Sequence, residues 1–405
     1  MKLEGRLKMN NIFKYATKEL SQDAFLCWSI NWLNEAASHP LYQYGKAILD
    51  LFLADKNQEH YYEVEVRSQY EKIDVLVLFK DVEGNPHALI IEDKTNTSEH
   101  SNQMLRYKEK LLEKTATDTS LQKYKNPKVH LVYIKTGIMY DEDIRMVGKG
   151  ATVVDLDDLL RVVSRFSKLN VSEILSSFND HIQGIKNRRL AVEAQIENGQ
   201  YEAALQDCYG QFYFLNKIFS ERSKGTKIGN QYIDANPNPP VFIDNIYSGT
   251  NNGGTPWTQY CFWGDKYPRN FINENENEYH YLFWRIDCKW RQYETNKWKP
   301  YFYIALRHYD THAHSGIEYL DERKRFVYRK FRNHADIEYA KWPHIFSKVG
   351  VRENYKESDL LFIPIEKIEH MRFDEIKELI AEITASFNEQ YDSLYSGLEE
   401  ALAAK

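Results

Sequence analysis

The sequence predicts an α/β protein, with a mixed β-sheet flanked by helices and then a C-terminal α+β domain rich in aromatic residues. Over residues 10–165, short apolar runs typical of strands alternate with segments of helical periodicity. Six of the eight tryptophans lie between residues 241 and 365, beyond a stretch rich in Pro, Asn and Gly. We therefore expect a core domain at 10–165, a helical connector at 170–222 and a second domain at 223–405. The expected role of the second domain is to recognise the substrate or to bind a partner.

Composition restricts the classes of function. A formal net charge of −6 excludes a protein that coats nucleic acid with its whole surface, so a polyanion would need a local basic patch or a metal. The four cysteines lie far apart without C-x-x-C spacing, which favours reduced thiols over a zinc site or disulfides. No apolar run approaches the length of a membrane span, and the N-terminus lacks a signal-peptide core. The expected location is the cytoplasm, without a membrane partner.

The first elements of the core are a helical stretch and three strands. Residues 10–55 show a wide apolar face at helical spacing, and the polar residues Glu19, Gln22 and Asp23 precede it. Alternation predicts a strand over 61–67, and apolar runs predict two more over 73–79 and 88–91. The turn sequence Glu83-Gly84-Asn85-Pro86 separates the last two, which predicts a meander.

Charged residues interrupt the two apolar strands where a core would not place them. Asp74 lies inside the run Ile73–Leu78, and Glu92, Asp93 and Lys94 directly follow Leu89-Ile90-Ile91. A buried carboxylate is costly unless it is paired or binds a metal. Alternate residues of a strand share a face, so Glu92 and Lys94 point one way and Asp93 points the other.

Pairing of these strands would bring Asp74 to Glu92 and Lys94 at one end of the sheet. Two carboxylates can hold a hard divalent cation, and the lysine can orient a water or stabilise charge on a phosphate oxygen. This set is sufficient for metal-assisted phosphodiester hydrolysis. The alternative is a strand end with a surface salt bridge.

An Asp on one strand followed by Glu-x-Lys on the next resembles the PD-(D/E)XK, restriction-endonuclease-like nuclease superfamily. The Pro of the family name is absent, since Ile73 precedes Asp74. The resemblance implies that Asp74 and Glu92 hold Mg²⁺ or Mn²⁺ and that Lys94 positions the attacking water. The stretch NIFKYATKELSQDAFLCW resembles the opening helix of one bacterial branch, which implies Glu19 as a further metal ligand. The alternative role for Glu19 is to stabilise the helix start through the macrodipole.

The next helix, expected over 97–114, carries Gln103 and Tyr107 four residues apart and hence on one face. A Gln-x-x-x-Tyr pair one helix after Glu-x-Lys is similar to RecB-like and lambda-exonuclease-like nucleases. The similarity implies that both side chains lie near the substrate, as part of the catalytic site. The alternative is an ordinary amphipathic helix. Strands at 129–135 and 151–155 and a helix at 156–166 complete the expected restriction-endonuclease-like core, and the resemblance ends there.

The C-terminal part carries strand-like segments at 279–290 and 299–308, a basic run at 323–332 and a final helix at 373–402. Basic side chains neutralise phosphates, which makes the basic run a candidate nucleic-acid contact, against the alternative of a solvated amphipathic segment. The candidate residues are Arg325, Arg329, Lys330 and Arg332. The apolar stripe of the last helix suits packing on its own domain, which we expect, or pairing with a second copy of the chain in a homo-oligomer.

The sequence thus predicts a Mg²⁺-dependent nuclease with DNA as the expected substrate. A catalytically silent module that holds nucleic acid or a protein on the same fold is the alternative. A nuclease component of a bacterial defence system would share the chemistry and add a trigger, a reading that depends on fold analogy alone.

Overall fold

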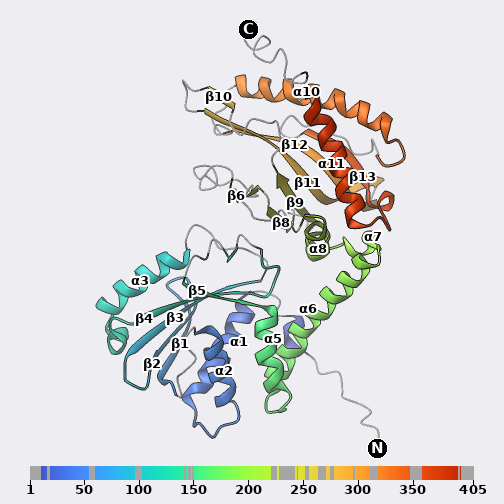
Figure 1. Ribbon diagram of the computed structural model, residues 1–405. Helices are drawn as coiled ribbons and strands as arrows, with labels where there is room; N and C mark the ends of the chain where they lie inside the picture. The colour runs from blue at the N-terminus through green and yellow to red at the C-terminus, as the bar shows by residue number, and fades with distance from the viewer. Residues whose placement is uncertain are drawn as a thin grey trace, which may run out of the picture. The chain divides into compact units, whose positions relative to one another are not determined.

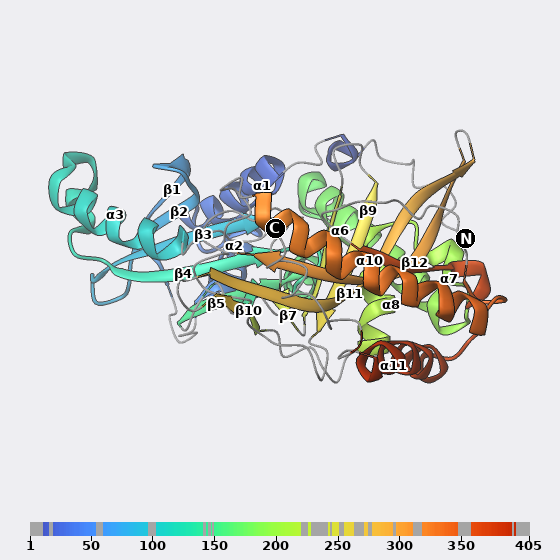
Figure 2. The same cartoon turned by 90° about the horizontal axis from the view of Figure 1, so that it is seen from above.

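The computed structural model divides into two compact units, Met1–Arg188 and Arg189–Lys405, and each is described by itself (Figures 1 and 2). The residues that the structure describes are 11–15, 19–53, 60–95, 103–140, 143–144, 147, 150–219, 226–227, 242–243, 245–250, 255–262, 271–273, 278–294, 297–310, 318–346, 358–390 and 393.

The first unit is built on a five-stranded mixed sheet in the order β1-β2-β3-β4-β5, as the alternation of strands and helices predicts. The first three strands pair antiparallel, whereas β3–β4 and β4–β5 pair parallel. The strands are β1 (Tyr62–Tyr70), β2 (Ile73–Lys80), β3 (Pro86–Lys94), β4 (Lys128–Lys135) and β5 (Ala151–Asp155). The unit is therefore a mixed α/β domain.

Helices cover both faces of this sheet (Figure 1). Side chains alternate along β2, so Val75 and Val77 join one apolar cluster with α1, α2, α5 and α6, and Leu76 and Leu78 join another with α3. The helices are η1 (Ile12–Lys14), α1 (Glu19–Asn31), η2 (Trp32–Asn34), α2 (Tyr42–Phe52), α3 (Gln103–Thr117), η3 (Thr119–Tyr124), α5 (Leu156–Ser167) and α6 (Glu173–Glu197). The expected helix start at 97–102 lies outside the described residues.

A tight turn determines the pairing of β2 with β3. Oδ1 of Asp81 accepts the backbone N–H groups of Glu83 and Asn85 at 2.9 and 2.8 Å. Gly84 adopts a φ of +83°, a conformation that a residue without a Cβ enters readily. The turn sets a register in which Val75 faces Ile91, so Asp74 and Glu92 follow at the next position.

The second unit contains an eight-stranded sheet with the path β13-β12-β11-β9-β7-β6, while β10 pairs with β11 and β8 with β9. The strands are β6 (Thr226–Lys227), β7 (Phe242–Ile243), β8 (Asn245–Thr250), β9 (Pro256–Phe262), β10 (Phe271–Asn273), β11 (Glu278–Glu294), β12 (Lys297–Asp310) and β13 (Ser358–Pro364). The helices are α7 (Tyr201–Ala204), α8 (Cys208–Phe219), α10 (Glu318–Lys341), η4 (Ile365–Lys367) and α11 (Phe373–Glu389).

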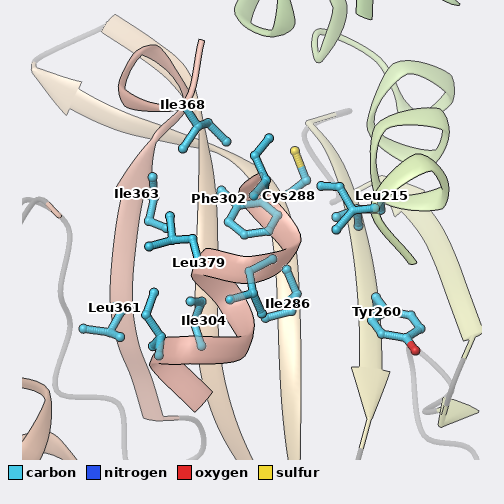
Figure 3. Close-up of a cluster of buried hydrophobic side chains, with 14 of the residues drawn as sticks. Leu215, Tyr260, Ile286, Cys288, Phe302, Ile304, Leu361, Ile363, Ile368 and Leu379 are labelled. Atoms are coloured by element: carbon cyan, nitrogen blue, oxygen red, sulfur yellow. The ribbon is translucent and has the colours of Figure 1, made fainter. Parts of the chain in front are cut away.

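The core of the second unit lies between one face of this sheet and its helices. Figure 3 shows Leu215 of α8 and Leu379 of α11 in the same cluster as Ile286 and Phe302 of the sheet. The predicted connector at 170–222 is shared between the units, because α6 crosses the boundary and α7 and α8 pack into the second core.

The apolar stripe of α11 is buried within its own unit, and its last expected members, Leu394 and Leu398, lie outside the described residues. Within the part of the chain that the structure describes, no helix combines the length and apolar character that crossing a membrane requires.

Candidate active site

Asp74, Glu92 and Lys94 lie together at the end of β2 and β3, on the face that α3 covers. Lys94 Nζ lies 2.6 Å from Oε1 of Glu92 and 3.8 Å from Oδ2 of Asp74. The Glu92 side chain is fully buried, whereas those of Lys94 and Asp74 are 12% and 18% exposed. Strand alternation and strand pairing therefore bring two carboxylates and one ammonium together, with access to solvent on one side.

Hydrogen bonds hold both oxygens of the Asp74 carboxylate. Oδ2 accepts the backbone N–H of Asp93 at 3.0 Å, and Oδ1 accepts Nε2 of Gln69 at 3.3 Å. Burial lowers the pKa of Lys94, but the hydrogen bond to Glu92 and the charges of Glu92, Asp74 and Glu19 outweigh it and raise the pKa above its ordinary value. Lys94 is therefore an ammonium at neutral pH.

Glu19 begins α1 and reaches the end of β3. Its Oε1 accepts the backbone N–H of Thr95 at 3.0 Å, one residue past Lys94. Its charge contributes to the raised pKa of Lys94, which places the carboxylate within electrostatic reach of the site. The structure thus brings Glu19 to the margin of the Asp74–Glu92–Lys94 group, where it ties the helix start to the strand end.

Gln103 and Tyr107 face the same group from α3. Gln103 Nε2 lies 2.5 Å from the hydroxyl of Tyr107, as the spacing of four predicts. Burial and the charges of Glu92 and Asp74 raise the pKa of Tyr107, although the hydrogen bond from Gln103 and the charge of Lys94 oppose the rise. The tyrosine therefore stays protonated, with its hydroxyl in the field of the two carboxylates.

A second carboxyl pair, which sequence reasoning did not assign to the site, lies on the opposite face of β3. Gln22 Nε2 donates to Oδ1 of Asp93 at 2.5 Å, and Gln22 Oε1 accepts the hydroxyl of Thr136 at 3.0 Å. Burial and the charge of Asp74 raise the pKa of Asp23 to about 6. Burial and the proximity of Asp23 hold the pKa of Asp93 well above its usual range. Asp23 and Asp93 therefore favour retaining a proton between them.

Lys135 of β4 lies in register with Lys94 but has its own counter-charge. Its Nζ lies 2.6 Å from Oδ2 of Asp143, and both side chains are fully buried. Tyr133 donates its hydroxyl to Oδ1 of Asp143 at 3.1 Å, and the backbone N–H of Tyr140 donates to Oδ2 at 2.9 Å. Burial lowers the pKa of Lys135 despite the charge of Asp143. This pair is balanced and does not offset the acids near Lys94.

Acids thus outnumber cations at this end of the sheet among the described residues. The electrostatic neighbours that act on Lys94, Asp23 and Asp93 are mainly carboxyl groups. These acids are Glu19, Asp23, Asp74, Glu92 and Asp93. A site with an excess of carboxylates stabilises an added cation.

The donor set suits Mg²⁺ or Mn²⁺ better than zinc. Asp74 and Glu92 offer oxygen ligands and already share one cationic group, Nζ of Lys94. Within the described residues there is no group of three or more His, Cys, Asp or Glu side chains arranged to hold a metal. Mg²⁺ is commonly bound through one or two carboxylates with water and substrate phosphate as the other ligands, so two carboxylates fit it.

The predicted nucleic-acid contacts lie on α10 of the second unit. The run is helical, so Arg325, Arg329 and Arg332 share a face. Arg329 is exposed, Lys330 and Arg332 are half-buried, and the side chain of Arg325 lies outside the described part. Phe331 is buried in the core cluster, so it anchors the helix while Arg329 faces solvent.

Comparisons with known proteins give no match. No protein-family model, curated protein or solved structure matches this chain. The side chains at the end of β2 and β3 are therefore the basis for inferring a function.

Proposed function

We propose that this chain is a Mg²⁺- or Mn²⁺-dependent nuclease of the PD-(D/E)XK, restriction-endonuclease-like class, with DNA as its substrate. The observation that supports the proposal is the meeting of Asp74, Glu92 and Lys94 on one face at the end of two neighbouring strands. The mixed sheet, with α1 and α3 on opposite faces, agrees with the fold expected for that class.

In this proposal Asp74 and Glu92 hold the metal. A bound Mg²⁺ would lower the pKa of a water and neutralise charge that develops on the phosphate. Lys94 keeps its proton at neutral pH, so it acts as a hydrogen-bond donor that orients the attacking water or a phosphate oxygen, and not as a base. The hydroxyl of Tyr107, held by Gln103, would contact the substrate beside the carboxylates.

The second candidate is a silent module that binds nucleic acid or a protein on the same fold. It is favoured by the ion pairs in the structure, because Lys94 already partners both Asp74 and Glu92, as it would in a structural salt bridge. A role in bacterial defence would use the nuclease chemistry and rests on fold analogy alone.

The test is cleavage of supercoiled and linear DNA with Mg²⁺ or Mn²⁺, against a chelator control. The wild type should cleave, whereas Asp74→Ala and Lys94→Ala should lose about 10²–10³-fold in rate or more while remaining folded by circular dichroism. Glu113→Gln, an exposed acid of α3, is the matched control and should cleave normally. A wild type without Mg²⁺- or Mn²⁺-dependent cleavage would favour the silent module, whereas full activity in both site variants would refute the assignment of Asp74 and Lys94 to catalysis.

A further inference from the structure

Gln69 has an unusual backbone conformation beside the candidate active site. It lies on β1 between the pairs Ser68–Val75 and Tyr70–Ile73, and thus opposite Asp74. Its φ is +53°, in the left-handed region that costs residues with a Cβ roughly 1–2 kcal/mol. The next positive φ values, at Glu71 and Lys72, belong to the two-residue hairpin turn, where this conformation is expected. Gln69 precedes that turn and lies within the strand, so the turn does not explain its conformation.

The side chain of Gln69 contacts two acids that belong to opposite faces of the sheet. Its Nε2 donates to Oδ1 of Asp74 at 3.3 Å and to Oδ2 of Asp23 at 3.1 Å. Asp74 lies with Lys94 on the α3 face, whereas Asp23 comes from α1 on the other face. One amide therefore links the candidate metal ligand to the buried carboxyl pair.

An amide suits this place better than the other polar groups. Its NH₂ carries two donors, one for each carboxylate. A carboxylate here would add a third negative charge, and a lysine would add a positive charge that competes with a metal for Asp74. The neutral amide donates to one oxygen of each acid and leaves the negative excess of the site intact.

We propose that Gln69 is a positioning residue of the candidate active site, whose amide keeps the Asp74 carboxylate turned toward Lys94 and apart from Asp23. With Oδ2 held by the N–H of Asp93 and Oδ1 held by Gln69, the Asp74 carboxylate has one orientation. Without the amide, Oδ1 loses its donor, and the hydrogen bond from Asp93 to Oδ2 alone restrains the terminal torsion of the Asp74 side chain. The inference rests on the proposed nuclease function, since it assigns the residue that prepares one of the two metal ligands.

Three variants of the full chain separate this role from a structural one. Gln69→Gly removes the amide and relieves the backbone, Gln69→Asn keeps a shorter amide, and Gln69→Glu keeps the shape but removes the donor. Each is assayed for kcat and KM on DNA, for melting temperature without metal, and for the Mn²⁺ concentration that gives half of the metal-dependent rise in melting temperature. Ser68→Gly, at the exposed neighbouring position, is the control for a glycine in this strand.

For Gln69→Gly we expect the metal-free melting temperature to stay at or above that of Ser68→Gly, because relief of the left-handed backbone offsets the lost hydrogen bonds. The half-saturating Mn²⁺ concentration should rise about 10–100-fold and kcat should fall by a similar factor, as for groups that support metal ligands. Gln69→Glu should show the same losses and also melt at a lower temperature without metal. Gln69→Asn should recover part of both losses.

The outcomes distinguish the inference from the function on which it rests. A wild type that neither cleaves DNA nor melts higher with Mn²⁺ would overturn both. A wild type that does both, alongside a Gln69→Gly variant with unchanged kcat and Mn²⁺ response, would overturn the positioning role alone. A Gln69→Gly variant that melts well below Ser68→Gly, with an unchanged Mn²⁺ response, would show that Gln69 only stabilises the strand.

Discussion

Both units bring carboxylates and cations together on one face of a strand, but in opposite proportions. In the first unit, Lys94 meets Asp74 and Glu92 at the end of β2 and β3. In the second, Asp287 lies in the middle of β11 with Arg285 Nη2 at 2.6 Å and Lys289 Nζ at 2.7 Å from its Oδ2. The first group has two acids for one cation, and the second has two cations for one acid.

The acid-rich group of the first unit is also more exposed to solvent than the cation-rich group of the second. The Asp287 and Arg285 side chains are 1% and 4% exposed, whereas Asp74 is 18% exposed at its strand end. A closed carboxylate with two cationic partners has little to gain from a metal, while an accessible excess of acids does. In sequence, both groups are charged residues within an apolar strand. Charge balance and position along the strand distinguish the structural ion cluster around Asp287 from the candidate metal site at Asp74.

The largest expected effect is on the stability of the second unit. Asp287→Ala would leave Arg285 buried without its 2.6 Å partner, which typically costs about 3–5 kcal/mol. Asp74→Ala in the first unit should cost less than about 1 kcal/mol, because its 3.8 Å pair with Lys94 is partly exposed and its loss also removes repulsion with Asp23. Chemical denaturation followed by tryptophan fluorescence measures both, and six of the eight tryptophans report on the second unit. Equal losses in the two variants would remove the distinction between the two groups.

Metal should stabilise the first unit alone. A cation that binds only the folded state adds about 2.7 kcal/mol at a concentration of 100 times its Kd. We expect Mn²⁺ to raise the melting temperature of the wild type and of Asp287→Asn, and to have no effect on Asp74→Asn. The measurement is calorimetric melting with and without Mn²⁺. If Mn²⁺ still raised the melting temperature of Asp74→Asn, the metal would bind at another place in the protein.

Asp23 in the first unit and His334 in the second should contribute to the acid response with opposite signs. The pKa of Asp23 is raised from 3.8 to about 6, so its stabilising contribution is complete below pH 3.8 and is lost as the pH rises through about 6. The shift corresponds to roughly 3 kcal/mol at most, and sharing of the proton with Asp93 reduces the expected change to about 1–2 kcal/mol. Denaturation of wild type and Asp23→Asn between pH 4.5 and about 7.5 measures it, and parallel curves would contradict the prediction.

In the second unit, burial lowers the pKa of His334 below its ordinary 6.5. The folded state therefore binds a proton less readily than the unfolded chain, and the contribution of His334 is lost as the pH falls below about 6.5. A His334→Gln variant should be less sensitive to acid than the wild type over that range.

The smallest expected effect concerns the exposed face of α10. Arg329→Ala should change stability by less than about 0.5 kcal/mol but lower the slope of log K for DNA against log salt by about 1, if Arg329 contacts one phosphate. Lys367→Ala, an exposed cation of the same unit outside the basic run, is the matched control. Titrations at several salt concentrations provide the slopes. An unchanged slope in Arg329→Ala would show that Arg329 contacts no phosphate.

The periodicity of strands and helices was sufficient to predict the residues at the centre of the candidate site. Period-two alternation places Glu92 and Lys94 on one face, and hairpin pairing brings Asp74 to them. A spacing of four brings Gln103 to Tyr107 within α3. Each of these contacts depends on the geometry of one element or of two neighbouring strands, which sequence pattern determines.

The residues around that centre were not predictable in this way. Alternation does send Asp93 to the opposite face, but its partner Gln22 comes from a helix 71 residues earlier, placed by the packing of the whole apolar face. Gln69 reaches Asp74 from a left-handed backbone that its residue type does not favour. In the second unit the alternation of Arg285 and Asp287 is visible in sequence, but their burial depends on tertiary packing.

The turn centred on Asp81 and Gly84 has a consequence for how such chains can vary. Because side chains alternate with a period of two, loss or gain of one residue between β2 and β3 would slide one strand by a single position and exchange its faces. Asp74 would then point into the apolar layer beneath α1 instead of meeting Glu92. A chain with an altered loop length would keep every acidic residue and still lack the site, so the length of this loop is as diagnostic of chemistry as the acids themselves.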